Sequence, residues 1–320
     1  MKFANREMDL SMWQEIRIVF ALVFVTIFVL AGISYAAAAQ QKTFPSAEEA
    51  VKAAVAAARS DSDNELLAIF GAQAKDLLLS GDAVADKQRR ARFLKAYDEK
   101  NGLVTEGDNR IVVVGSNNWP FPIPLVKKGD GWVFDTDKGK EEILNRRIGQ
   151  DELDAIQVSL AYVDAQREYA MKSRDGGGLR GYAEKFRSDP GKKNGLYWEA
   201  KAGEEQSPLG PFAARARSEG YGQNKPSDKP VPYHGYYYKI LTAQGKDAPG
   251  GARSYILKGK MIGGFALIAY PAEYDNSGIM SFIVNHEGKV FQKDLGKNTA
   301  SAAAALKEYN PDKTWAEVKQ

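Results

Sequence analysis

The chain has 320 residues, 44% of them hydrophobic and 27% charged, a composition typical of a folded protein that excludes wholesale disorder. It has no cysteine, which excludes disulfide frameworks, thiolate metal sites and cysteine nucleophiles. Its two histidines are too few for a three-histidine metal site within one chain. The formal net charge of +3 is spread among acidic residues and does not point to a nucleic-acid partner. The length suits two domains.

Residues 1–39 have the features of an export leader. A charged start precedes an uncharged run from Ile18 to Ala39, which ends in small residues that suit a signal peptidase. The run is also long enough to span a bilayer of about 30 Å at about 1.5 Å per residue, so a retained membrane anchor over residues 18–39 is the alternative. Met12 is an alternative start that shortens the leader. Both interpretations place residues 40–320 outside the cytoplasm, either in the periplasm or anchored in the inner membrane.

Residues 44–137 are predicted to form a first α+β domain. Ser46 and Glu49 make a capping box that begins a helix. Two more helices are indicated by apolar spacing, at 66–70 and 83–100. Strands follow at 110–115, 119–127 and 132–136, the last two joined by a turn at Gly129–Gly131. Prolines at 120, 122 and 124 cannot donate to a ladder, so the segment that holds them is expected to be an edge strand or an extended arm.

This order of helices and then strands, with Gly-Trp-Val-Phe at 131–134, resembles the nuclear-transport-factor-like cone folds of small exported bacterial domains. In such folds a curved sheet wraps a helix and forms a pocket. The resemblance implies a cone-like α+β domain, and another α+β sandwich is the alternative. Four aromatic residues are then candidates for lining a hydrophobic ligand pocket, with simple core packing as the other interpretation: Trp119, Phe121, Trp132 and Phe134.

Residues 138–320 are predicted to form a long helix, a loop-rich insertion and an antiparallel β domain. The helix covers 138–173 and has a candidate break at Gly149. The insertion at 173–232 is rich in glycine and proline, yet it holds too many aromatic residues for a solvated linker. One short helix is expected in it, at 212–218. Five strands and a final helix follow, at 236–242, 253–258, 261–269, 279–285, 289–294 and 299–309.

Several whole segments are similar to one family of exported bacterial proteins, known as domain of unknown function 2950. They span most of the chain after the leader, at 119–126, 141–149, 155–170, 233–245 and 263–296. The resemblance implies no activity, because the family has none assigned. Members often carry an acidic loop after the long helix. Here that loop is Arg174-Asp175-Gly176-Gly177-Gly178, and its single carboxylate cannot make a calcium loop.

The last strands also resemble the globular part of type IV pilins and pseudopilins. The shared pattern in the final hairpin is Phe282, Val284, Gly288 and Val290. This resemblance implies a pilin-like arrangement, in which a long helix packs on an antiparallel sheet. A pilin's apolar helix continues into its globular helix and follows a peptidase site. Here the apolar run lies far upstream and no such site exists, so the resemblance implies a fold and not filament assembly.

No motif assigns a catalytic residue, a metal ligand or a cofactor. The sequence has no G-x-S-x-G, H-E-x-x-H or phosphate loop. His234 beside Tyr236 and Tyr238 is a weak candidate for a general base, although alternating aromatics on a strand favour core filling. His286 falls in a predicted hairpin turn, which argues against metal ligation.

Two runs of arginines are interpreted as solvated helix faces. The first is Lys87, Arg89, Arg90 and Arg92, for which an anionic surface partner is the alternative. The second pairs Glu142 with Arg146 four residues later, beside Arg147. Neither run is assigned to a site.

The sequence therefore predicts an exported, non-enzymatic protein that acts as a binding or envelope-associated scaffold. Its partner would be an unidentified envelope protein. The alternative is a small-ligand-binding protein or a weak hydrolase that uses the pocket of the first domain.

Overall fold

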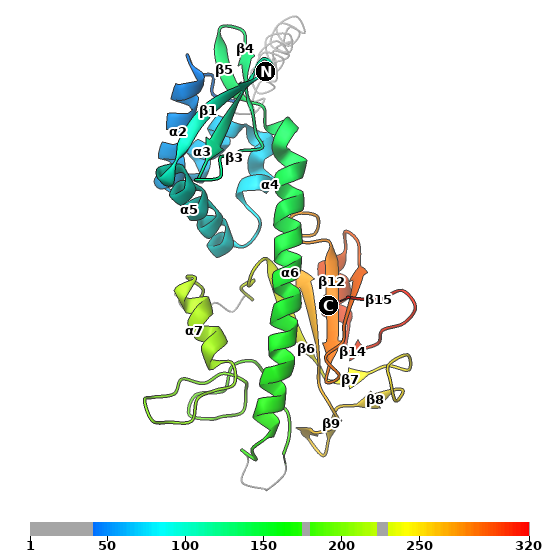
Figure 1. Ribbon diagram of the computed structural model, residues 1–320. Helices are drawn as coiled ribbons and strands as arrows, with labels where there is room; N and C mark the ends of the chain where they lie inside the picture. The colour runs from blue at the N-terminus through cyan, green and yellow to red at the C-terminus, as the bar shows by residue number, and fades with distance from the viewer. Residues whose placement is uncertain (1–40, 175–179, 223–229, 320) are drawn as a thin grey trace, which may run out of the picture. The chain divides into compact units, whose positions relative to one another are not determined.

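The computed structural model describes residues 41–174, 180–222 and 230–319, which belong to one compact unit that begins at Gln41 (Figure 1). The predicted leader at 1–39 and residues 175–178 of the glycine-rich loop lie outside the described residues. Within the described ranges, no helix is both long and apolar enough to cross a membrane.

The first half places helices before a five-stranded antiparallel sheet. The helical segments are α2 (Ala47–Arg59), α3 (Asp63–Phe70), the 3₁₀ turn η1 (Ala72–Ala74), α4 (Lys75–Leu78) and α5 (Ala83–Glu99). The strands are β1 (Asn101–Glu106), β2 (Asn109–Val114), β3 (Trp119–Pro120), β4 (Leu125–Lys128) and β5 (Gly131–Phe134). Their order in the sheet is β1-β2-β4-β5, and β3 pairs with β2. The three predicted helices are confirmed, and Ser46 caps α2 by accepting from the Glu49 amide.

One prediction for these strands is wrong. The single strand predicted at 119–127 is broken between Pro120 and Leu125, because Pro122 and Pro124 have no N–H to continue the ladder. Strand β1 was not predicted; it begins at Asn101, which pairs with Val114. This strand is mostly exposed, so it lacks the apolar alternation that reveals a strand in sequence.

The helices of the first half cover the sheet and form one core. Helix α5 packs on β1 and β2, and α2 and α3 pack on β5. Buried side chains of this core come from every layer, among them Ala50, Leu66, Ile69, Val114, Leu125 and Phe134. Helix α2 supplies small residues at helical spacing, which lets the helix approach the sheet closely.

Helix α6 (Thr136–Ala170) is continuous over 35 residues, so the predicted break at Gly149 is wrong. A single glycine lowers helix stability by only about 1 kcal/mol relative to alanine, which the packing of a long helix offsets. Its first turns contact η1 and α4, and its later turns pack on the C-terminal sheet. Ile143 packs against the first core, whereas Ala155 and Tyr162 belong to a second one. The domain boundary at 137/138 stays a prediction.

Two glycines of α6 provide a matched test of this packing. A Cβ at Gly149 meets nothing within 4 Å, so Gly149→Ala should raise the free energy of unfolding by about 0.5–1 kcal/mol. A Cβ at Gly139 lies 2.5 Å from the Pro122 carbonyl oxygen, so Gly139→Ala should lower it by about 1–2 kcal/mol despite the better helix propensity. Urea unfolding measures both. Equal effects would mean that α6 does not press against the Pro122 segment.

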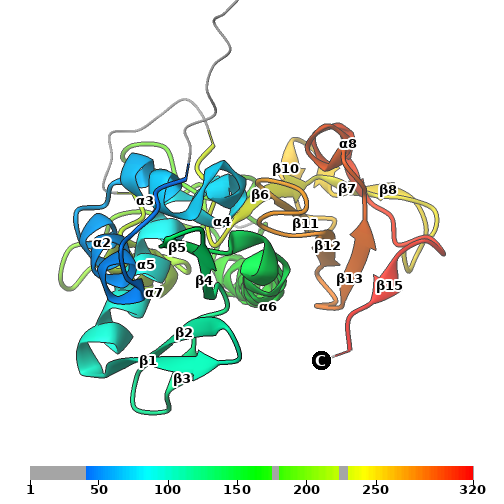
Figure 2. The ribbon, with the colours of Figure 1, turned by 90° about the horizontal axis from the view of Figure 1, so that it is seen from above.

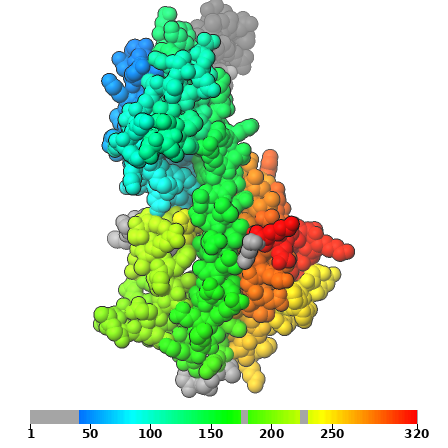
Figure 3. Space-filling model, in the orientation of Figure 1, coloured from blue at the N-terminus to red at the C-terminus, as the bar shows by residue number. Residues whose placement is uncertain are grey.

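The second half combines α6 with a five-stranded antiparallel sheet in the order β15-β13-β12-β11-β6. Its strands are β6 (Tyr236–Leu241), β11 (Ala266–Pro271), β12 (Met280–Asn285), β13 (Val290–Asp294) and β15 (Ala316–Glu317). Figure 2 looks nearly along α6 and shows β11–β13 and α8 (Thr299–Ala305) on one side of it, with α2, α3 and α5 on the other. The space-filling view shows the insertion and the C-terminal strands flanking an open face of α6 (Figure 3). The insertion holds α7 (Gly210–Ser218), as predicted.

Short strands surround this sheet: β7 (Ala243–Gln244), β8 (Arg253–Ser254), β9 (Ile256–Leu257), β10 (Lys260–Met261) and β14 (Glu308–Tyr309). The predicted strands at 253–258 and 261–269 are therefore each broken. Gly264, with φ of +138°, separates β10 from β11. The predicted helix at 299–309 ends at Ala305, because the fully buried Tyr309 pairs in β14 instead. The α+β class is confirmed.

Candidate functional site

A cavity of about 640 Å³ lies among the helices and sheet of the first half. Its floor is apolar and comes from α2, α3, β2 and β5, with Val55, Phe70, Val112, Val114 and Phe134 all less than a tenth exposed. Ligand sites in proteins commonly have volumes of about 300–1,000 Å³ and mostly hydrophobic walls. This cavity therefore has the size and the lining of a site for a small apolar molecule.

Three of the four predicted pocket aromatics line this cavity: Trp119, Phe121 and Phe134. Trp132 does not, so that part of the prediction is wrong. It shares a strand face with Phe134 but lies two residues nearer the hairpin turn, where it forms a bridge with Phe44. The segment before α2 thus pairs with β5 at Trp132 through backbone hydrogen bonds.

Five arginines join the apolar lining of the cavity. Arg89, Arg90 and Arg92 come from α5, and Arg146 and Arg147 come from α6. Arg147 is only 5% exposed, and the side chains of Arg89 and Arg90 are 24% and 16% exposed. The Arg146 side chain is 51% exposed, and Arg92 is exposed too. The lining therefore runs from an apolar floor to a cationic mouth.

The buried arginines bind groups behind the cavity wall. Arg89 Nη2 lies 2.6 and 2.7 Å from the two carboxylate oxygens of Asp151. Arg90 pairs with Asp61 and Asp63 at 2.9 and 2.5 Å. These contacts correct the interpretation of the first run as a solvated helix face, because the side chains of Arg89 and Arg90 are mostly covered by protein.

The two arginines of α6 also differ from each other, since Arg147 is buried and Arg146 is exposed. Arg147 donates to the carbonyl oxygens of Asp76 and Leu77 at 2.7 and 2.5 Å, and to Asn276 Oδ1 at 2.5 Å. Arg146 pairs with the exposed Glu142, as predicted, and its guanidinium lies 5.3 Å from the Trp119 ring centre. Arg147 is thus a structural bridge, whereas Arg146 is a surface group beside the cavity.

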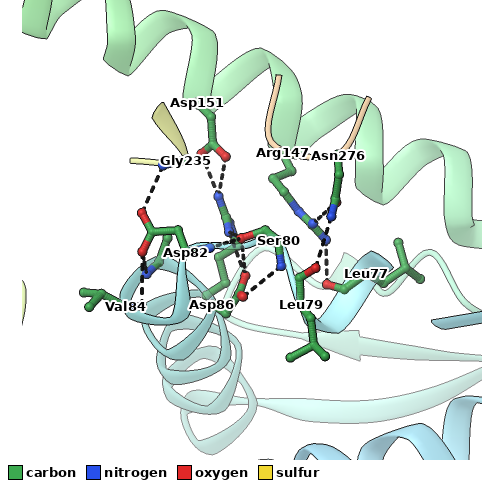
Figure 4. Close-up of polar contacts among 12 residues, drawn as sticks. Leu77, Leu79, Ser80, Asp82, Val84, Asp86, Arg147, Asp151, Gly235 and Asn276 are labelled. Atoms are coloured by element: carbon green, nitrogen blue, oxygen red, sulfur yellow. Dashed lines mark hydrogen bonds and ion pairs between the residues drawn. The ribbon is translucent and has the colours of Figure 1, made fainter. Parts of the chain in front are cut away.

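A buried polar cluster adjoins the arginines and ties α5 to the second half of the chain (Figure 4). Asp82 Oδ1 caps α5 by accepting from the amides of Val84 and Ala85 at 3.1 and 3.0 Å. Its Oδ2 accepts from the Gly235 amide at 3.0 Å and from the Tyr221 hydroxyl at 2.8 Å. One carboxylate therefore links α5, the insertion and the start of β6.

The charges of this cluster are strongly perturbed by burial. Burial raises the pKa of Asp151 to about 7, although Arg89 and Arg147 both act to lower it. Burial and the neighbouring Arg89 cation lower the pKa of Arg147 to about 10. Burial also raises the pKa of Asp86, which accepts from the amide and the hydroxyl of Ser80. The cluster thus holds its charges at a desolvation cost.

The weak candidates on β6 are separated from the large cavity. Tyr236 is fully buried and donates to the Met280 carbonyl oxygen at 2.8 Å, which is a core role. Tyr238 lines a second cavity of about 240 Å³ and donates to the Tyr233 carbonyl oxygen at 3.3 Å. His234 lies 3.2 Å from Glu219 and 3.5 Å from Asp154. It lines neither of these cavities.

The described residues contain no group of three or more His, Asp or Glu side chains that could hold a metal ion. The second histidine, His286, lies in the turn after β12, as predicted. Burial and the nearby Arg253 lower its pKa.

The arginines at the cavity mouth were not predicted as site residues, although the sequence holds a signal for them. On α5 the cavity-lining positions are 89, 90, 92, 93 and 96, and on α6 they are 143, 146, 147 and 150. Both sets follow helical spacing and mix arginine with Phe93, Ala96 or Ile143 on one face. Arginines that share a face with apolar residues do not form a purely solvated face. This mixture is the observable clue.

Comparisons with known proteins place the chain in a family. No curated protein is significantly similar to it, and no solved structure matches it. A family model described as "Protein of unknown function (DUF2950)" matches residues 41–318, nearly all of the chain after the predicted leader. The chain therefore belongs to the DUF2950 family, as the resemblance of its segments predicts.

Proposed function

We propose that this protein binds a small, largely apolar ligand in the cavity of its first half and acts outside the cytoplasm. The cavity of about 640 Å³, with its apolar floor, is the observation that carries the proposal. Location outside the cytoplasm is supported by the leader-like sequence at 1–39.

Ligand binding, the alternative in the sequence analysis, becomes the preferred function. A scaffold role predicts a docking surface, and the described residues offer no surface feature as well defined as this cavity. A cone-like fold of the first half would account for the cavity, since a curved sheet that wraps a helix leaves space between them. The pilin-like arrangement of the second half would then serve as support for α6.

The energy available in the cavity is sufficient for useful affinity. A ligand that buries about 300 Å² of apolar surface gains about 7 kcal/mol at about 25 cal/mol per Å². Loss of translational and rotational freedom opposes this gain by several kcal/mol. Micromolar binding therefore requires a ligand that fills most of the cavity, or additional polar contacts.

Blocking the cavity should abolish binding. Ala54 on α2 lines the cavity, so Ala54→Trp places an indole in the ligand space. Ala56 is exposed on the same helix and does not line the cavity, so Ala56→Trp is the matched control. Fluorescence titration with Nile red, an uncharged apolar dye, should give saturable binding to the parent chain and to Ala56→Trp. Ala54→Trp should lower the affinity at least about tenfold.

The folded state of each variant is checked by circular dichroism and urea unfolding. Equal dye binding by Ala54→Trp and Ala56→Trp would place the dye elsewhere and contradict the proposal. Absence of saturable binding to the parent chain, both by Nile red and by the chain probes of the next subsection, would contradict it as well.

A further inference from the structure

We propose that the ligand is an amphiphile with one hydrocarbon chain and a carboxylate head group, and that Arg92 and Arg146 hold this head group at the cavity mouth. The inference rests on the proposed function and names its ligand class. Its basis is the distribution of charge around the cavity, which differs between the floor and the mouth.

The lining is strongly one-sided in charge. Among the described residues that line the cavity there are five arginines and neither aspartate nor glutamate. The carboxylates that pair with Arg89 and Arg90 belong to residues outside the lining, so they neutralise those arginines from behind the wall. An anion at the mouth therefore meets positive charge with no carboxylate of the lining against it.

Arg92 and Arg146 are the two arginines available to a ligand. Arg92 is exposed and forms no ion pair or hydrogen bond with any residue that the structure describes. Arg146 pairs only with the exposed Glu142, and a surface pair of this kind contributes little and is readily exchanged. The Trp119 ring beneath its guanidinium orients Arg146 next to the cavity.

Two deeper arginines supply donors without acceptors. The Nε–H groups of Arg90 and Arg147 are buried and have no hydrogen-bond partner in the described part of the chain. Both side chains line the cavity. Because these groups are closed to solvent, a ligand does not replace the missing acceptors, and the two cations add positive potential to the cavity wall. A carboxylate offers several lone pairs in the planar geometry that guanidinium groups recognise.

The floor determines the rest of the ligand. Its lining residues from α2, α3, β2 and β5 are apolar, so a polar or multiply charged body would lose hydration there without compensation. A hydrocarbon chain gains from burial at the same place. A single anionic group on an apolar chain fits both ends of the cavity, whereas a sugar phosphate or a nucleotide fits only the mouth.

The test compares dodecanoate with 1-dodecanol, which has the same chain length and no charge. Both are titrated at pH 8 against the complex of the full chain with Nile red. Their concentrations are kept below those at which they self-associate. Dodecanoate should bind at least about tenfold more tightly than dodecanol, because charge-assisted hydrogen bonds hold its head group. The double variant Arg92→Gln/Arg146→Gln should bind the two ligands equally.

The matched control removes two positive charges, one in α5 and one at its C-cap, at positions that do not line the cavity. Lys95 and Lys100 are exposed and do not line it, so Lys95→Gln/Lys100→Gln should keep the preference for dodecanoate. Raising the salt concentration should weaken dodecanoate binding and leave dodecanol binding unchanged.

The outcomes separate this inference from the proposed function. Equal binding of dodecanoate and dodecanol to the parent chain would overturn the carboxylate and leave the apolar cavity standing. Tighter binding of dodecyl phosphate than of dodecanoate would overturn the assignment of the head group. If neither chain probe nor Nile red binds, the proposed function fails. A preference for dodecanoate that survives in Arg92→Gln/Arg146→Gln would overturn the role of these two residues.

Discussion

Asp82→Ala is expected to lower the free energy of unfolding by about 3–5 kcal/mol. The Asp82 side chain caps α5 through one oxygen and accepts from Gly235 and Tyr221 through the other. It is 1% exposed, so water cannot replace these contacts without opening the structure. Removing the carboxylate leaves four donors without their acceptor. Urea unfolding followed by circular dichroism measures the loss.

Two further variants divide this effect. Ser46→Ala removes the exposed cap of α2, which accepts only from Glu49, and should lower the free energy of unfolding by about 1 kcal/mol. Asp82→Asn keeps a capping oxygen but turns an amide N–H₂ toward Gly235 and Tyr221, so its effect should lie between those of the other two. If Asp82→Ala were no more harmful than Ser46→Ala, the contacts to the second half would contribute nothing.

Local signals predicted most of the helices. Ser46 with Glu49 predicted α2, and the caps that the structure shows at Asp82 of α5 and Gly71 of α3 likewise act within one helical turn. Caps of this kind can be recognised without knowing the fold, because donor and acceptor are neighbours in the sequence. The same holds for the turn at Gly129, where φ of +62° favours glycine.

Contacts between distant residues could not be predicted in this way. Asp82 lies 139 residues from Tyr221 and 153 from Gly235. Asp82 as an N-cap follows from its position before α5, but its second oxygen has no signature in the local sequence. Asp151 likewise resembles the other carboxylates of α6, and only the packing of α5 against it distinguishes it. No candidate list from sequence contained either residue.

The candidate site was predicted only for its aromatic part. Trp119, Phe121 and Phe134 follow from the resemblance to cone folds, which identifies the strands of the pocket. Arg92 and Arg146 required the placement of α5 and α6 beside one cavity, which depends on their tertiary contacts. Charged side chains on a helix have the same periodicity whether they face solvent or a ligand, so sequence alone favours the commoner solvated role.

The polar cluster and the cavity share Arg89 and Arg147. Arg89 lines the cavity and also binds Asp151 on α6. The position of α5, and with it the cavity wall, therefore depends on an ion pair whose carboxylate is almost completely removed from solvent. Such pairs are weak contributors to net stability because desolvation opposes the Coulomb attraction, but they respond strongly to protonation.

Stability is accordingly expected to fall as the pH rises from about 4 to about 7, through Asp151. Burial raises the pKa of this carboxyl from its ordinary 3.8 to about 7. In that range the native state holds a proton that the unfolded state has released, so the unfolded state binds fewer protons and the slope of the free energy of unfolding against pH is negative. The contribution is fully present below pH about 4 and is lost as the pH passes about 7. A shift of this size corresponds to on the order of 4 kcal/mol.

Asp151→Asn removes the titrating group, so its free energy of unfolding should change less between pH 4 and 7.5 than that of the parent chain. Asp164→Asn, at an exposed carboxylate on the same helix, should follow the parent. Glu205, whose pKa the ammonium groups of Lys172 and Lys193 lower to about 2, contributes with the opposite sign. The stability that Glu205 contributes is lost only when the pH falls below the ordinary pKa of this group, 4.5, and the loss is common to all three proteins. Parallel curves for the parent and Asp151→Asn would show that Asp151 is ionised throughout, and that its pairing with Arg89 outweighs burial.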